Sequence, residues 1–232
     1  MQRSWAAPFV ETFENAFAGM KVDYQTNPFI FLNKWDVVSD LYSRMRAIDE
    51  AREVKTARYT IGRDGRWREK RFSIDPISTK PLHISMGFDR GERGRADICY
   101  IDLSTMQVAV TARYSKKRPA SIASWRFSSG AGISVVMNTE VQYARRRNTT
   151  TGRFSKTEGM REIEREINRE ITDLKSWDKS ILLFVDNHGL FTRNELDETF
   201  SRKLNPYTMK LYYLSPKSGF FITGKRKQKD DI

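Results

Sequence analysis

Hydrophobic residues recur at helical spacing in four parts of the chain. In the first part, Phe9, Phe13 and Phe17 lie four residues apart, so their side chains share one face of a helix. The longest stripe begins at Met160, and the Ser155–Glu158 pair before it has the spacing of a capping box at a helix N-terminus. These patterns predict helices over residues 8–20, 33–48, 157–175 and 192–204.

Shorter β-prone runs lie between these helices. Asp64 and Gly65 separate two of them, and an Asp-Gly pair in that position favours a tight hairpin. Ser104 and Thr105 separate two further runs, which are apolar enough to form a largely buried second hairpin. The predicted strands span residues 51–62, 66–75, 81–88, 95–103, 106–114, 180–187, 209–215 and 219–224.

The order of these elements fits one domain. Mixed strands with helices on their faces predict an α/β or α+β fold, in which helices flank a mixed sheet. The chain has 232 residues, a length for which a single domain is the default. We expect that domain to span residues 1–224 and to carry a basic, mobile insertion around 115–156, followed by a charged tail over 225–232.

Charge changes this picture, because the chain carries 41 Lys and Arg against 29 Asp and Glu, a formal charge of +12. Such an excess attracts polyanions at long range, and nucleic acid is the commonest polyanion in a cell. The charge therefore predicts a nucleic-acid partner, with DNA favoured over RNA. A basic surface that only keeps the protein dissolved and an anionic membrane surface remain alternatives.

The scarcity of cysteine and histidine excludes several chemistries. Cys99 is the only cysteine, so neither an intrachain disulfide nor a cysteine-based zinc site can form. His83 and His188 are the only histidines, and we expect both to have structural roles. No segment has the long apolar run of a signal peptide or a membrane-spanning helix. These features predict a cytoplasmic protein without a membrane segment.

Two-thirds of the excess charge lies in residues 113–153. This stretch holds nine basic residues and a single acidic one, Glu140. Aromatic residues interleave with the charges, as in proteins that stack nucleic-acid bases; the alternative is that they anchor the stretch to the core. The residues predicted to bind nucleic acid are Arg113, Lys116, Lys117, Arg118, Arg126, Arg145, Arg146, Arg147 and Arg153, together with Lys225, Arg226 and Lys227 of the tail.

Polar residues also converge on the second predicted hairpin. Asp97 begins its first strand, and Thr111 and Arg113 lie two residues apart on its second strand, where they share one face. If the hairpin turns at Ser104, Asp97 and Thr111 lie side by side. The alternative is that Asp97 is a strand-end residue in a salt bridge with a neighbouring arginine.

This hairpin resembles the active-site hairpin of the PD-(D/E)XK, restriction-endonuclease-like nucleases. In that superfamily an Asp begins one strand, an (Asp/Glu)-x-Lys motif follows on the next, and a helix then packs on the sheet. The carboxylates hold Mg²⁺, and the Lys orients or activates the attacking water. The likeness covers about residues 20–190, and the Pro28-Phe29 turn and the Lys34-Trp35-Asp36 segment are similar to an archaeal and viral branch.

The chain departs from the family motif at the positions that matter for catalysis. Thr111 stands at the second carboxylate and Arg113 at the lysine, and neither replaces the original chemistry. The resemblance thus implies a nucleic-acid-binding protein with a degenerate, inactive site that needs no cofactor. One alternative is an active Mg²⁺-dependent endonuclease, in which Asp97 still binds the metal and Asp36 joins a rearranged carboxylate set. Another is an assembly protein with a basic loop, and a homodimer is also open.

Overall fold

The structure, a computed structural model, describes residues 7–51, 57–59, 77–79, 82–87, 95–101, 135–144, 155–173 and 177–225. Its centre is a six-stranded mixed sheet in which the strands follow one another in chain order. These strands are β3 (Leu82–Gly87), β4 (Arg95–Ile101), β5 (Val135–Tyr143), β6 (Trp177–Val185), β7 (Met209–Leu214) and β8 (Gly219–Thr223). The short strands β1 (Ala57–Tyr59) and β2 (Ile77–Thr79) form a separate antiparallel pair.

The sheet changes direction in its middle. β3, β4 and β5 are antiparallel neighbours, whereas β5, β6 and β7 run parallel, and β8 returns antiparallel to β7. Parallel neighbours need a crossover, and each crossover here contains a helix. The helix α4 (Lys156–Asp173) connects β5 to β6, and α5 (Arg193–Phe200) connects β6 to β7.

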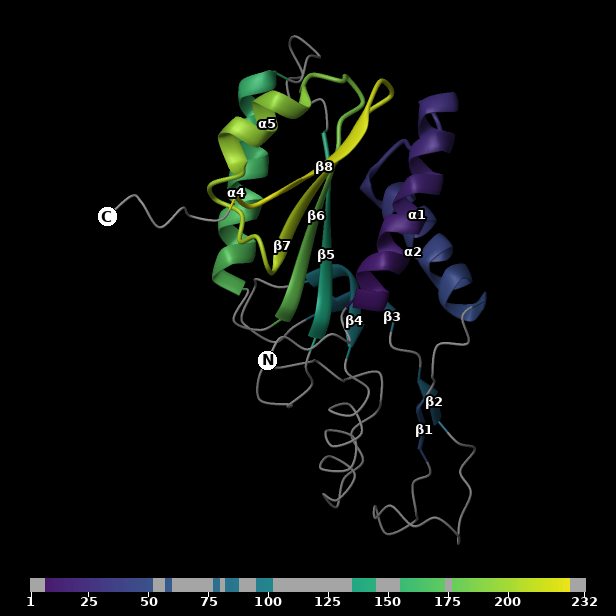
Figure 1. The fold of residues 1–232 in the computed structure, drawn as a ribbon. Coiled ribbons are helices and arrows are strands. Elements are labelled where there is room, and N and C mark those ends of the chain that lie inside the picture. The colour runs from purple at the N-terminus through teal and green to yellow at the C-terminus, as the bar shows by residue number, and fades with distance from the viewer. Residues whose placement is uncertain are drawn as a thin grey trace, which may run out of the picture.

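Helices cover both faces of the sheet, so the molecule has three layers (Figure 1). The first two helices, α1 (Ala7–Thr26) and α2 (Lys34–Ala51), lie on one face, and α4 and α5 lie on the other. Alternate residues of β6 serve the two layers: Leu183 packs with α1 and α2, and Leu182 packs with α4 and α5. The described part of the chain is therefore a mixed α/β fold with helices on both sides of the sheet.

Polar contacts tie the first layer to the sheet. Asp49 of α2 is buried and accepts hydrogen bonds from Thr12 of α1 (3.2 Å) and from the Tyr100 hydroxyl of β4 (2.7 Å). Phe9 stacks on the Tyr100 ring, with 4.2 Å between the ring centroids. These contacts fix the position of α2 relative to β4, which matters because the start of α2 contributes to the site described below.

The hydrophobic patterns predicted the helices well. All four are present, and α1 is longer than expected because it continues to Thr26. The capping box before α4 is confirmed: Glu158 accepts from the Ser155 amide (3.0 Å), and Ser155 accepts from the Glu158 amide (3.2 Å). The mixed sheet flanked by helices is confirmed as well.

The second predicted hairpin is wrong in its pairing. β4 pairs with β3 on one edge and with β5 on the other, so residues 106–114 are not its neighbour over Ile98–Ile101. Residues 106–114 themselves lie outside the described part. The strand β5 was missed, because it lies within the stretch whose charge and glycines predicted a mobile insertion. Its first seven residues are buried, and a strand that is covered on both faces shows no alternating pattern.

Candidate active site

The strands β4 and β5 separate at one point of the sheet. Their register ends at the pair Ile98 and Thr139. Beyond that pair, β4 continues back to Arg95 as a partner of β3, and β5 continues to Tyr143 as a partner of β6. The two strands therefore form a fork within the described residues, and the fork begins with Asp97 on β4 and Glu140 on β5.

Both carboxylates lie on the α4 side of the sheet. Ile98 and Tyr100 pack with α1 and α2, so the alternation of β4 turns Asp97 towards the other face. On β5, Glu140 pairs with Leu182, whose side chain packs in the α4–α5 layer. Asn138 and Gln142 lie two residues before and after Glu140 and share its face. One face of β5 thus carries a polar stripe beside Asp97.

Three cationic or amide groups contact the two carboxylates. The Lys34 ammonium lies 2.7 Å from Oδ2 of Asp97 and 3.3 Å from Oε1 of Glu140. The Arg169 guanidinium of α4 lies 2.9 Å from the same Oε1 of Glu140 and 2.9 Å from Glu166. The backbone N–H of Val141 donates to Oδ2 of Asp97 at 2.8 Å. The site therefore draws on β4, β5, α4 and the first residue of α2.

The start of α2 is held in place by a second capping box. The Asn33 side chain accepts from the amides of Trp35 (2.7 Å) and Asp36 (3.3 Å), while Asp36 accepts from the Asn33 amide at 3.1 Å. The turn before it is tied to β5, because the Tyr143 hydroxyl donates to the carbonyl of Phe31 at 2.9 Å. This anchoring fixes the backbone of Lys34 next to the fork.

Burial controls the charge state of the pair. The side chains of Asp97 and Glu140 are both only 5% exposed. Burial, followed by the charge of Asp97, raises the pKa of Glu140 to about 8, although Lys34 and Arg169 act in the opposite direction. Burial alone would lower the pKa of Lys34, but Glu140 and Asp97 raise it above its ordinary value. Lys34 is therefore a cation, and the ionised form of Glu140 is under-compensated by the two cations beside it.

The arrangement fits a small divalent cation. Mg²⁺ prefers oxygen ligands, uses one or two protein carboxylates and keeps several waters. Asp97 and Glu140 supply two carboxylates, and both contact one position that a cation, the Lys34 ammonium, already occupies. Among the described residues, no group of three or more His, Cys, Asp or Glu side chains is arranged as a metal site. The protein's share of the ligands would be this carboxylate pair.

The structure brings only part of the predicted site together. Asp97 lies at its centre, but Asp36 does not join it, because its carboxylate caps the start of α2. Lys225 is exposed and forms an ion pair with Asp197 at 2.7 Å. The other predicted residues lie outside the described part: Thr111, Arg113, Lys116, Lys117, Arg118, Arg126, Arg145, Arg146, Arg147, Arg153, Arg226 and Lys227.

Sequence reasoning missed Glu140, Gln142, Lys34 and Arg169. A signal for two of them was present, because Glu140 is the single acidic residue in a strongly basic stretch and is followed two residues later by Gln142. Lys34 stands two residues before Asp36 in the segment that carried the family resemblance. Its role depends on a contact over 63 positions in sequence, which no local pattern reveals.

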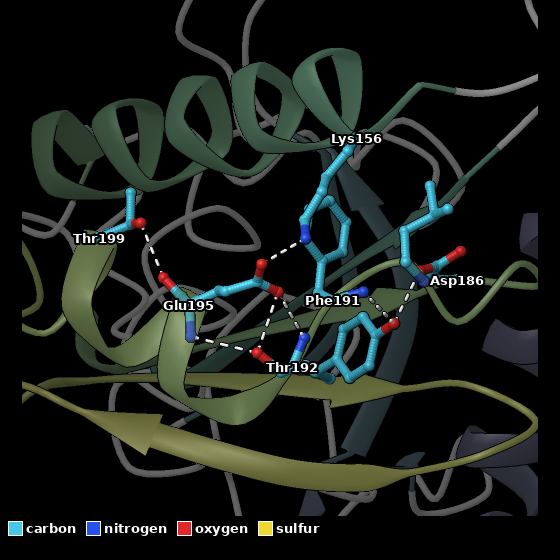
Figure 2. Close-up of polar contacts among 8 residues, drawn as sticks. Lys156, Asp186, Phe191, Thr192, Glu195 and Thr199 are labelled. Atoms are coloured by element: carbon cyan, nitrogen blue, oxygen red, sulfur yellow. Dashed lines mark hydrogen bonds and ion pairs between the residues drawn. The ribbon is translucent and has the colours of Figure 1, made fainter.

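A second polar cluster lies where β6 ends and α5 begins (Figure 2). Asp186 is completely buried and accepts from the amides of His188 (2.8 Å) and Leu190 (2.7 Å) and from the Tyr213 hydroxyl (2.7 Å). Its carboxylate thereby forms the turn after β6, in which Gly189 has a φ of +64°. These bonds are structural, since Asp186 is directed at backbone amides of its own loop.

Next to that turn, Thr192 and Glu195 form the capping box of α5, as Figure 2 shows. Glu195 accepts from the Thr192 amide at 3.0 Å and forms an ion pair with Lys156 at the start of α4. The bonds with Lys156 and Thr192 lower the pKa of Glu195 to about 2. This cluster fastens α5 to α4.

Comparison of the chain with models of protein families, with curated proteins and with solved structures finds no match in any of the three. Within the described residues, no helix combines the length and the apolar character needed to cross a membrane. The class of protein is therefore given by the fold and the site alone. It is a three-layer mixed α/β protein with a buried carboxylate pair at a strand fork.

Proposed function

We propose that the protein is a metal-dependent phosphodiester hydrolase that acts on nucleic acid, with Asp97 and Glu140 as the metal-binding carboxylates. The single observation that carries this proposal is the fork, where two buried carboxylates from adjacent strands both contact the Lys34 ammonium. Two carboxylates that share a buried site with too little positive charge are costly for folding, so they point to a function.

The resemblance to PD-(D/E)XK nucleases supports this proposal once β5, and not residues 106–114, is taken as the second strand of the motif. The family places an Asp at the start of one strand, a second carboxylate on the next and a helix after it. Here Asp97 stands near the start of β4, Glu140-Val141-Gln142 lies on the neighbouring strand β5, and α4 follows β5 and packs on the sheet. In this arrangement β5 provides the second carboxylate. The departures from the family motif at Thr111 and Arg113 then no longer argue against a metal site.

The chemistry follows from the groups at the fork. In hydrolysis of a phosphodiester, the oxygen of water forms a bond to phosphorus, one ester P–O bond breaks, and the leaving oxygen takes up a proton. A divalent cation held by Asp97 and Glu140 would supply Lewis-acid stabilisation of the phosphate oxygens. Gln142 replaces the family's lysine and is neutral, so it can orient a water or a phosphate oxygen by hydrogen bonding only. The +12 charge of the chain favours a polyanionic substrate.

Replacement of Glu140 tests the proposal. Glu140→Gln keeps the shape of the side chain and removes its charge, so Mg²⁺-dependent cleavage of plasmid DNA and of single-stranded DNA and RNA should fall roughly 100-fold or more. The matched control is Glu14→Gln, because Glu14 also pairs with a lysine, Lys210, at 2.7 Å, but far from the fork in sequence. Absence of Mg²⁺-dependent cleavage by the unaltered chain, or cleavage that survives in Glu140→Gln, would contradict the proposal.

A second candidate function is nucleic-acid binding without catalysis. It is favoured by the Lys34 ammonium, which already neutralises part of the carboxylate pair without any metal. In that case the protein binds DNA or RNA with an affinity that falls steeply with salt, because each phosphate contact releases counter-ions. Salt-dependent binding together with no cleavage at any Mg²⁺ concentration would favour this function over hydrolysis.

A further inference from the structure

We propose that Lys34 has two successive partners: the carboxylate pair in the metal-free protein, and a phosphate of the substrate once a divalent cation is bound. Lys34 would thus be a catalytic residue supplied by α2, outside the strands that carry the carboxylates. This inference rests on the proposed hydrolase function and adds a residue to it.

The first step of the argument concerns shared atoms. Lys34 contacts Oδ2 of Asp97 at 2.7 Å and Oε1 of Glu140 at 3.3 Å, so its ammonium lies between the two carboxylates that a metal ion would need. A metal ion held by both carboxylates would take the position of the ammonium itself, and like charges at such short range repel strongly where water is largely excluded. Arg169 contacts Glu140 as well, but not Asp97. A divalent cation and the Lys34 ammonium must therefore compete for the pair.

The second step concerns which cation can leave. Arg169 is 41% exposed, but it has a partner outside the pair, Glu166 of its own helix, at 2.9 Å. Lys34 has ion-pair contacts with Asp97 and Glu140 alone among the described residues, and its side chain is 26% exposed. Its backbone is fixed by the capping box of α2, whereas its flexible four-carbon chain can change rotamer. Displacement would move the ammonium towards solvent without disturbing the fold.

The third step concerns where the displaced charge goes. The ammonium stays within a side-chain length of the fork, which is where the phosphate would bind. Negative charge grows on the phosphate oxygens during hydrolysis, and a lysine next to them stabilises the transition state more than the ground state. Gln142 cannot supply this charge because its amide is neutral. Among the described residues at the fork, Lys34 is the cation whose carboxylate partners both belong to the pair.

The test uses Lys34→Met in the full chain and measures two quantities that should move in opposite directions. Removal of the competing charge should tighten Mg²⁺ binding by roughly tenfold or more, measured by calorimetry without substrate. Loss of the phosphate contact should lower kcat for DNA cleavage at saturating Mg²⁺ by roughly 100-fold. Lys210→Met is the matched control, since Lys210 pairs with Glu14 at 2.7 Å and is 33% exposed; it should change neither quantity.

Each other outcome overturns the inference. Weaker Mg²⁺ binding together with slower cleavage would show that Lys34 only supports the structure. Tighter binding together with faster cleavage would show that Lys34 merely inhibits. Lys34→Arg keeps the charge and guards against a folding defect: it should retain more activity than Lys34→Met, and equal losses would also contradict the role. Because calorimetry needs no turnover, it reports on competition at Lys34 even if Glu140→Gln shows that the hydrolase proposal fails.

Discussion

Two buried carboxylates near the ends of neighbouring strands differ in the groups that contact them. Asp186, after β6, is surrounded by donors: two backbone amides of its own turn and the Tyr213 hydroxyl contact its two oxygen atoms. Glu140, near the end of β5, contacts the charged ends of Lys34 and Arg169, while a second carboxylate, Asp97, lies beside the same ammonium. Both residues are buried, but only Glu140 is short of stabilising donors.

The difference separates a structural carboxylate from one suited to chemistry. Backbone amides are fixed dipoles, and a carboxylate that accepts from them cannot exchange its partners without unfolding the turn. A side-chain cation such as Lys34 is held by a flexible chain, and under the proposed function a metal ion would take its place. Burial, followed by the charge of Asp97, raises the pKa of Glu140 to about 8, because Lys34 and Arg169 offset these effects only in part. Polarity and burial alone therefore do not identify a site; the nature of the partners does.

Substitution of Asp186 should lower the stability of the fold without lowering the cleavage activity of the folded molecules. Asp186→Ala leaves the His188 and Leu190 amides and the Tyr213 hydroxyl without their acceptor in a buried turn. We expect a loss of about 3–5 kcal/mol in the free energy of unfolding, because each buried donor without a partner costs about 1–3 kcal/mol. Urea denaturation measures the loss. Below the melting temperature, cleavage per folded molecule should remain close to that of the unaltered chain, and selective loss of cleavage would remove the contrast with Glu140.

Substitution of Glu140 should have the reverse effect on stability. A carboxyl group whose pKa is raised in the folded state binds more protons folded than unfolded, so its contribution to stability is lost as the pH rises from about 4.5 to about 8. Glu140→Gln removes that dependence. The stability of the variant relative to the unaltered chain should therefore increase between pH 5 and pH 9, by roughly 4 kcal/mol. Thermal or urea unfolding as a function of pH measures it.

Glu14→Gln provides a control of opposite sign for this pH dependence. Burial alone would raise the pKa of Glu14, but hydrogen bonds from Lys210 and Tyr212 and the charge of Lys210 lower it below the usual 4.5. Its stabilising contribution is present above pH 4.5 and disappears as the pH falls through the lowered pKa. The Glu14→Gln difference should therefore appear on the acid side only. A relative stability of Glu140→Gln that does not change with pH would contradict the under-compensated state of Glu140.

The sequence predicts the helices and the layers better than the site, and the reason is the range of the contacts involved. The stripe of α4 and the capping box at Ser155 and Glu158 are local patterns, and both are present. The pairing of β4 is not local, because its partner β5 begins 34 residues after the end of β4, as the positions of Ile101 and Val135 show. The sequence favours the nearer run at 106–114 as the partner, because a short hairpin is enough to join two antiparallel strands.

Asp97 could be predicted because a carboxylate at the start of a buried strand is unusual. Glu140 and Gln142 were hidden by their surroundings, since the charges and glycines on either side of β5 suggested a loop. In the segment of residues 34–36, the sequence predicts a role for Asp36. In the structure, Lys34 reaches the fork, whereas the Asp36 carboxylate caps the start of α2. A carboxylate in the first turn of a helix is more often a cap than a ligand.

The capping boxes of α2 and α5 provide the smallest and most selective comparison. Thr192→Ala removes the cap of α5, and Asn33→Ala removes the cap of α2; each should lower the free energy of unfolding by about 1 kcal/mol. Asn33 directly precedes Lys34 in the chain, whereas Thr192 precedes a different helix. Only Asn33→Ala should therefore also reduce kcat, by up to roughly tenfold, through misplacement of the Lys34 ammonium. Denaturation and cleavage assays on both variants separate these effects. Equal kcat values in the two variants would mean that the capping box of α2 supports the helix without positioning Lys34 for the reaction.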